Sequence, residues 1–247
     1  MNDAPELLEL LQEEKALLRR VLIPARDRFE QAGQNMDLAL FFLAHGWNVC
    51  EMAKAATLLM EAGEPFTMPL LARVALESTF NLLASVRHKP FAPQKIAFEW
   101  EEMAGKLEFF IKSGSWDPGR KPTPAQCRQT ADNIRKNYAV DPKSWKQIEQ
   151  VAKKAELTPY YDDDYRFLSL HVHANQIGIM NTAAGFLSRK AGIALANALF
   201  ITTNALLGVA GLSAQFDPEL ATIQTRMEIL MQRPDLFPPW PNDPKNS

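Results

Sequence analysis

The uncharged stretch AGIALANALFITTNALLGVAGLSAQF, residues 191–216, decides the fold class of this 247-residue chain. From Phe167 to the end of this stretch, Arg189 and Lys190 are the only Asp, Glu, Lys or Arg residues. A helix that is apolar on all sides occurs either in the core of a large helical protein or across a membrane. The helix predicted at 192–216 is therefore either the buried centre of a bundle or a membrane anchor.

Polar side chains within this stretch favour the buried centre. They are Asn197, Thr202, Thr203, Asn204, Ser213 and Gln215. Ala and Gly contribute little transfer free energy, so the signal for membrane insertion is weaker than the length suggests. Buried amides at 197 and 204 need partners on neighbouring helices or a polar cavity. We expect no membrane span, and a membrane-attached protein is the alternative.

The overall composition describes an ordered chain of nearly neutral charge. The 27 Lys plus Arg against 29 Asp plus Glu argue against a strongly basic nucleic-acid module, and 47% hydrophobic residues exclude a disordered protein. Cys50 and Cys127 are too few for a disulfide framework, and the N-terminus lacks the apolar core of a signal peptide. We expect a cytoplasmic protein, and no motif indicates a metal or a cofactor.

Helical periodicity extends outward from the apolar stretch along most of the chain. We predict helices at residues 3–24, 25–44, 48–63, 67–87, 94–112, 123–138, 141–155, 161–174 and 217–232, with 175–190 ambiguous. Pro24 and the pair His45-Gly46 are expected to interrupt the first helices, and Asn48 with Glu51 to form a capping box. Thr123 with Gln126 forms another capping box, and the helices at 123–138 and 141–155 are polar enough to be peripheral. Glu14 belongs to the polar faces of the first helix.

Alternating strand patterns and long internal repeats are absent from the sequence, so we predict an all-α protein. Its expected architecture is a single helical bundle-like domain at residues 1–232, with a core at about 35–215. Residues 233–247 contain five of the 17 prolines, which predicts an extended or disordered Pro-rich tail.

Arg73, Glu77 and Asn81 form a polar stripe in an otherwise apolar helix, because residues at i, i+4 and i+8 share one face. The stripe could face solvent with a salt bridge worth only a few tenths of a kcal/mol. It could also be a buried polar line, whose charges need partners on other helices because unpaired buried charge is costly.

A second polar cluster lies in YYDDDYRFLSLHVHAN, residues 160–175. If this segment is helical, Arg166, Ser169 and His173 line one face. Seven residues of an α-helix rotate the chain by about 700°, which is about 20° less than two full turns. His171 lies about 140° from Arg166, so His173 is its expected partner. The acidic triplet 162–164 is explained by the helix dipole in a first turn and is a weak signal for Mg²⁺.

The spacing from Arg166 to His173, Arg-x6-His, resembles the Arg-x(4–6)-His signature of HEPN-domain proteins, although Phe167 replaces a commonly polar residue. Arg-x3-Glu at Arg73 and Tyr-x2-Leu-Ser-x2-Val-His from Tyr165 are similar to a pattern in uncharacterised bacterial all-helical proteins linked to that superfamily. The resemblance covers residues 35–215.

This resemblance implies a metal-independent ribonuclease of the toxin or phage-defence type, acting on RNA as a homodimer. His173 would be the general acid or base and Arg166 would stabilise the phosphorane charge. Arg73, Glu77, Asn81, Tyr165, Ser169 and His171 would bind substrate or form a polar network. The alternative is a non-catalytic helical scaffold or sensor in which the same residues form a buried polar network.

Overall fold

The computed structural model describes residues 5–31, 36–63, 67–117, 119, 121–140, 147–172 and 184–233, and these described residues contain helices and no strand. The elements are α1 (Pro5–Gln31), α2 (Met36–Ala62), α3 (Met68–Arg87), α4 (Phe91–Lys112), α5 (Pro124–Tyr138), α6 (Ile148–Lys154), α7 (Thr158–Tyr160), the π-helical turn η2 (Tyr161–Tyr165), α8 (Arg166–Val172), α10 (Ala184–Ala210) and α11 (Ser213–Met231). The all-α prediction is confirmed.

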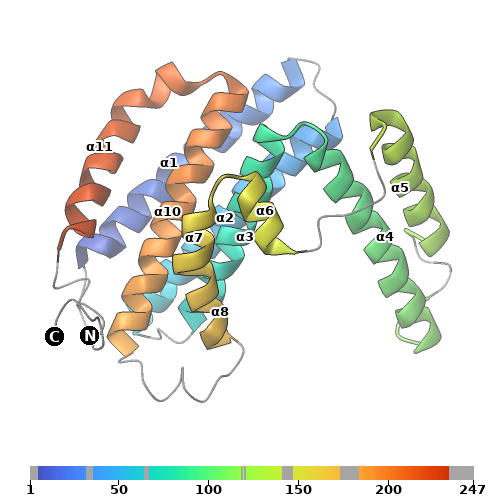
Figure 1. Cartoon of the computed structure of the whole chain (residues 1–247), viewed down its shortest axis with the longest axis horizontal. Coiled ribbons are helices and arrows are strands. Elements are labelled where there is room, and N and C mark those ends of the chain that lie inside the picture. The colour runs from blue at the N-terminus through green and yellow to red at the C-terminus, as the bar shows by residue number, and fades with distance from the viewer. Residues whose placement is uncertain are drawn as a thin grey trace.

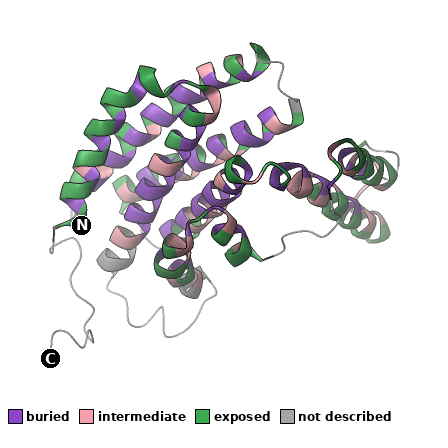
Figure 2. Cartoon of the chain, turned by 45° about the horizontal axis from the view of Figure 1, so that its top comes forward, coloured by how far each residue is buried: buried purple, intermediate pink, exposed green. Residues whose placement is uncertain are grey.

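Most of the apolar stretch, residues 191–210, lies in α10, which is at the centre of a bundle with α1, α2 and α3 around it (Figure 1). By length and composition the segment Arg189–Ala210 could cross a membrane, but 72% of its most apolar part is buried inside the chain. Buried residues face inward on each helix and exposed ones face outward (Figure 2). The predicted long, central, apolar helix is confirmed.

Two predicted helix interruptions are wrong. α1 continues through Pro24, because the buried stripe on both sides of it, from Leu22 to Phe29, stays in the core and offsets the lost backbone hydrogen bond. α2 continues through His45 and Gly46, where a Cβ atom would lie 2.7 Å from Leu22 and 2.8 Å from Leu206. Gly46 thus permits a close approach of three helices and does not end one.

Other helix ends differ from prediction for similar reasons. Asn48 is not a cap, and its amide donates a 2.6 Å hydrogen bond to Ser78 on α3. α10 ends at Gly211, which adopts a left-handed φ of +65°, and α11 begins at Ser213, not at 217. The Thr123–Gln126 capping box is confirmed. The predicted start of the helix at 141, the open segment 175–183 and most of the Pro-rich tail lie outside the described residues.

Helices α4 and α5 form an arm that leaves the bundle, as Figure 1 shows on its right-hand side. They pack mainly against each other, through two small apolar clusters that are separate from the main core. The peripheral position predicted for residues 123–138 is confirmed. The same prediction for 141–155 is wrong where the structure describes that segment, because α6 packs against α3 and buries Val151 and Ala152.

The sequence predicted Glu14 on a polar face of its helix, and this prediction is wrong. Glu14 lies in the leucine-rich stripe that α1 turns toward the core. Its residue exposure is 2%, and both carboxylate oxygens are buried without a hydrogen-bond partner among the residues described. Burial, and to a lesser degree the neighbouring Glu13, raises the pKa of this carboxyl well above its usual value.

We predict that Gly46→Val lowers the free energy of unfolding by about 1–3 kcal/mol, since the new side chain must displace Leu22 and Leu206. Gly208→Ala is the control, because its Cβ meets no atom within 4 Å, and it should be neutral or stabilising by at most about 1 kcal/mol. Urea unfolding measures both. Equal stability of the two variants would contradict the close packing at Gly46.

Glu14→Gln should stabilise the protein more at about pH 7 than at about pH 4. The folded-state pKa is raised above the value of 4.5 expected for the unfolded chain, so the wild type has full stability below 4.5 and loses it as pH rises toward the folded pKa. Urea midpoints across this pH range measure the difference. The exposed Glu102→Gln is the control, and a Glu14→Gln effect that does not change with pH would show that the carboxyl is not buried.

Candidate functional site

Arg73, Glu77 and Tyr165 meet where the turn η2 packs against α3. The Tyr165 hydroxyl donates a 2.6 Å hydrogen bond to Glu77 Oε1 and accepts a 3.1 Å hydrogen bond from Arg73 Nε. Arg73 Nε also lies 3.2 Å from Glu77 Oε1, as the i, i+4 spacing permits. We call these three residues the Arg–Glu–Tyr cluster. It joins segments that are 88 residues or more apart in the sequence.

The cluster lies at the edge of the core and reaches solvent through its charged members. Tyr165 is buried, whereas the side chains of Arg73 and Glu77 are 21% and 37% exposed. Burial and the hydrogen bond to Glu77 raise the pKa of Tyr165 to about 12, so the phenol stays protonated. Burial opposes the charge of Arg73, but the bonds to Tyr165 and Glu77 outweigh it and raise its pKa.

Aromatic contacts fix the ring of Tyr165. Tyr161 stacks on it with 5.3 Å between ring centroids, and Phe80 of α3 lies 6.1 Å away. The guanidinium carbon of Arg73 is 5.2 Å from the ring centroid, within cation–π range. The ring is therefore held on several sides, and its hydroxyl has one defined position.

Asp164 and Tyr165, the last two residues of the π-helical turn η2, both reach the interior. A π-turn adds a residue to a helix and shifts the faces that follow it, and such turns are frequent at functional sites. Asp164 is 4% exposed and Tyr165 is 5% exposed. The acidic triplet 162–164 lies in the first turn of η2, as expected, but this turn is π-helical and directly follows α7.

Asp164 forms a second polar contact that the sequence did not reveal. Its carboxylate lies 2.6 Å from Lys190 Nζ at the start of α10 and is also hydrogen-bonded by Asn197. Burial raises the pKa of Asp164, and Lys190 and Asn197 act against that rise. One signal could have suggested this pair: Lys190 is one of two charges beside the uncharged stretch, and a lysine there needs a partner.

Arg166 lies at the surface and is not part of the Arg–Glu–Tyr cluster. Its side chain is 68% exposed, and its guanidinium lies 3.4 Å from Asp162 one turn earlier. The pKa of Glu149 on α6 is lowered, mainly by its hydrogen bond from Lys153 and to a smaller degree by the charge of Arg166. His173 lies outside the described residues, and so does the side chain of His171, whose backbone is in α8.

The remaining predicted residues support the local backbone. Ser169 donates to the Tyr165 carbonyl oxygen at 2.8 Å, and Asn81 donates to the Glu77 carbonyl oxygen at 2.9 Å. The buried Asn81 Oδ1 has no hydrogen-bond partner in the part of the chain that the structure describes. Within the same part, no three His, Cys, Asp or Glu side chains are grouped so that they could hold a metal ion.

Comparison with known proteins gives a family but no function. Residues 40–186 match the model of the family of unknown function DUF5677, and the chain belongs to this family. The match includes the Arg–Glu–Tyr cluster, Arg166, His173 and the α4–α5 arm. No curated protein matches the chain, and no solved structure matches it either.

We predict that Tyr165→Phe lowers the free energy of unfolding by about 1–3 kcal/mol, because it leaves partly buried Arg73 and Glu77 without the bridging hydroxyl. Tyr161→Phe is the matched control, since it retains the stacked ring, and should change stability by less than about 0.5 kcal/mol. Thermal and urea unfolding measure both. An equal effect of the two substitutions would show that the cluster contributes no more than the stacked rings.

Proposed function

Starting from membership in a family of unknown function, we propose that this protein is a cytoplasmic, metal-independent endoribonuclease of the toxin or phage-defence type, with Arg166 and His173 as its catalytic residues. The observation that carries the proposal is the position of Arg166. Its side chain is 68% exposed and comes immediately after Tyr165, which the Arg–Glu–Tyr cluster holds in the interior.

Recognition of a phosphate by an exposed arginine requires a fixed backbone at the arginine. Arginine binds phosphate with two parallel hydrogen bonds, and this geometry is effective only when the side chain projects from a fixed backbone. Here the aromatic stack and the hydrogen bond from Ser169 to the Tyr165 carbonyl oxygen hold the backbone on the N-terminal side of Arg166. The cluster is thus assigned a positioning role.

The chemistry proposed is attack of a ribose 2′-hydroxyl oxygen on the adjacent phosphorus. The bond from phosphorus to the 5′-oxygen of the next nucleotide breaks, so that one product ends in a 2′,3′-cyclic phosphate and the other in a protonated 5′-hydroxyl. His173 would take the 2′-hydroxyl proton or protonate the leaving 5′-oxygen, and Arg166 would stabilise the charge of the phosphorane. Asp162 orients the arginine in the free protein, and a phosphate would replace it as the partner. The arginine of one subunit would act with the histidine of the other in a homodimer, as the resemblance to HEPN proteins implies.

Cleavage of a short single-stranded RNA in excess EDTA tests this proposal. We expect Arg166→Ala and His173→Ala each to lower the rate by at least about 100-fold, the range of a lost general acid, base or charge stabiliser. Arg20→Ala, purified in the same way, is the control, because Arg20 is an exposed arginine that pairs with Glu219 on another face. If Arg166 and His173 of one site come from different subunits, a mixture of the Arg166→Ala and His173→Ala proteins should regain cleavage activity.

A second function, a non-catalytic scaffold or sensor, is favoured by one observation: Arg73, Glu77 and Tyr165 satisfy one another without any ligand. On this reading the wild type cleaves no RNA, and the only effect of cluster substitutions is on stability. Two results would therefore refute the ribonuclease proposal and support the scaffold or sensor. In one, the wild type and both catalytic variants cleave RNA at the same rate; in the other, none of them cleaves RNA.

A further inference from the structure

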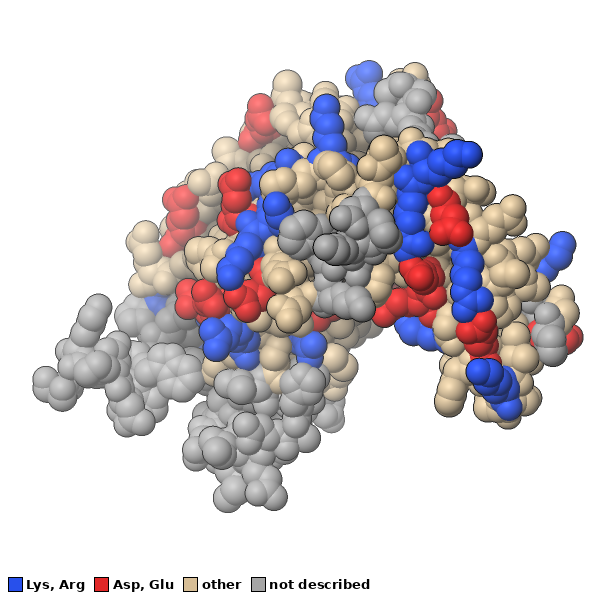
Figure 3. Space-filling model, turned by 45° about the vertical axis from the view of Figure 1, so that its right-hand side comes forward, with Lys and Arg blue, Asp and Glu red and all other residues tan. Residues whose placement is uncertain are grey.

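The two flanks of α5 differ in chemistry. On one flank Arg128 lies 2.7 Å from Glu108, and Arg135 pairs with Glu101, so that ion pairs join this edge to α4. Basic and acidic side chains lie next to one another on the arm (Figure 3). The opposite flank presents Gln126, Gln129, Thr130 and Asn133, which share a face by their helical spacing. None of these four side chains is charged, and Lys136 borders the flank beside Gln129.

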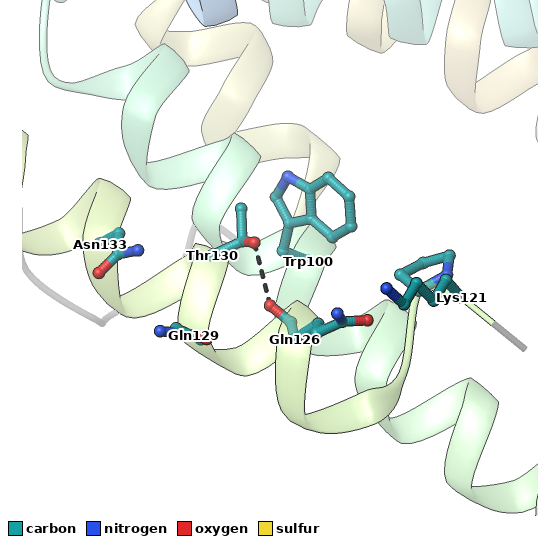
Figure 4. Close-up of a pocket in the computed structure, with 7 residues that line it drawn as sticks. Trp100, Lys121, Gln126, Gln129, Thr130 and Asn133 are labelled. Atoms are coloured by element: carbon teal, nitrogen blue, oxygen red, sulfur yellow. Dashed lines mark hydrogen bonds between the residues drawn. The ribbon is translucent and has the colours of Figure 1, made fainter. Parts of the chain in front are cut away.

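A pocket of about 500 Å³ opens along this uncharged flank, between α5, α4 and the segment before α5. Figure 4 shows the Trp100 indole of α4 between Thr130 on one side and Lys121 on the other, with Gln126, Gln129 and Asn133 along the rim. The pocket is open to solvent along one side, so a ligand would lie against its lining without being enclosed. The lining contains one cation and no carboxylate.

Some groups of the pocket are fixed and others are available. Trp100 packs against both apolar clusters of the arm, so its indole is held in place. Gln126 Oε1 accepts from the Thr123 backbone, and the Thr130 hydroxyl donates to the Gln126 carbonyl oxygen.

The available groups are Gln129, Asn133 and Lys121. The two amides make no hydrogen bond, and the lysine makes no ion pair, with any residue for which the structure gives a position. The pocket therefore offers a fixed aromatic surface, free amide donors and acceptors, and a free ammonium group.

We propose that this pocket binds a nucleotide, with the base against Trp100 and the phosphate toward Lys121. Side-chain amides match the paired donors and acceptors on base edges, and an indole provides the flat apolar surface on which bases stack. The lysine and the lack of carboxylates favour an anionic ligand over a neutral sugar. The proposal stands apart from the proposed ribonuclease, because the lining residues belong to α4, α5 and the segment before α5, whereas Arg166 and the Arg–Glu–Tyr cluster belong to α3, η2 and α8.

The nucleotide could be free or part of a single-stranded RNA, and binding measurements separate the two. Intrinsic fluorescence and calorimetry would be recorded on the full chain with AMP, GMP, CMP and UMP, with a ten-nucleotide RNA, and with neutral monosaccharides. The catalytic variant His173→Ala serves as the background, so that RNA is not degraded during the titration. The Gln129→Ala, Asn133→Ala double variant and Lys121→Ala remove the exposed groups and leave Trp100 in place.

We expect the Kd for the nucleotide or the RNA to rise about tenfold or more in the double variant, and binding to depend less on salt in Lys121→Ala. Asn137→Ala, on the same flank but outside the lining, should bind like the background protein. No binding of any nucleotide or RNA up to about 1 mM, equal binding by all variants, or binding of sugars alone would overturn the proposal. Nucleotide binding without RNA cleavage would uphold it while the proposed ribonuclease fails.

Discussion

From Ala191 onward α10 carries no charged side chain and most of its residues are buried, and the rest of this structure depends on covering this part of the helix. The free energy gained by burial increases with the apolar area removed from water, so long neighbours cover it better than short ones. α1 and α2 accordingly run uninterrupted for 27 residues each and lie against α10 together with α3. The close approach of α1, α2 and α10 at Gly46 results from the same requirement.

The polar groups gather where this apolar covering ends. Asp164 is paired with Lys190 and hydrogen-bonded by Asn197, both in the N-terminal half of α10, and the Arg–Glu–Tyr cluster is satisfied in the same way at the edge of α3. Buried polar groups are tolerated when each has a partner, and they then define one packing arrangement more sharply than apolar contacts do. The short segment η2 and α8 is thereby attached to the bundle at two polar points, and Arg166 projects from the attached part.

The arm formed by α4 and α5 is a different kind of structure. Its two small clusters, around Trp100, bury little area, and ion pairs close one edge. Surface ion pairs contribute little each, so the arm depends on packing between its two helices. Its position away from the bundle leaves the uncharged flank of α5 accessible, while the Arg166 surface is formed by other elements.

Local sequence signals determined the helical content, the central position of α10, the span of α3 and the capping box at Thr123, because periodicity and capping act within a few residues. Only the tertiary structure decided that Pro24 and Gly46 lie inside helices, that Glu14 is buried, and that Asp164 pairs with Lys190. The stripe of Arg73 and Glu77 was visible in the sequence, but its third member, Tyr165, comes from a distant turn whose π-helical geometry no local pattern specifies. These features depend on which helix surfaces meet, and burial across such contacts outweighs the preferences of single residues.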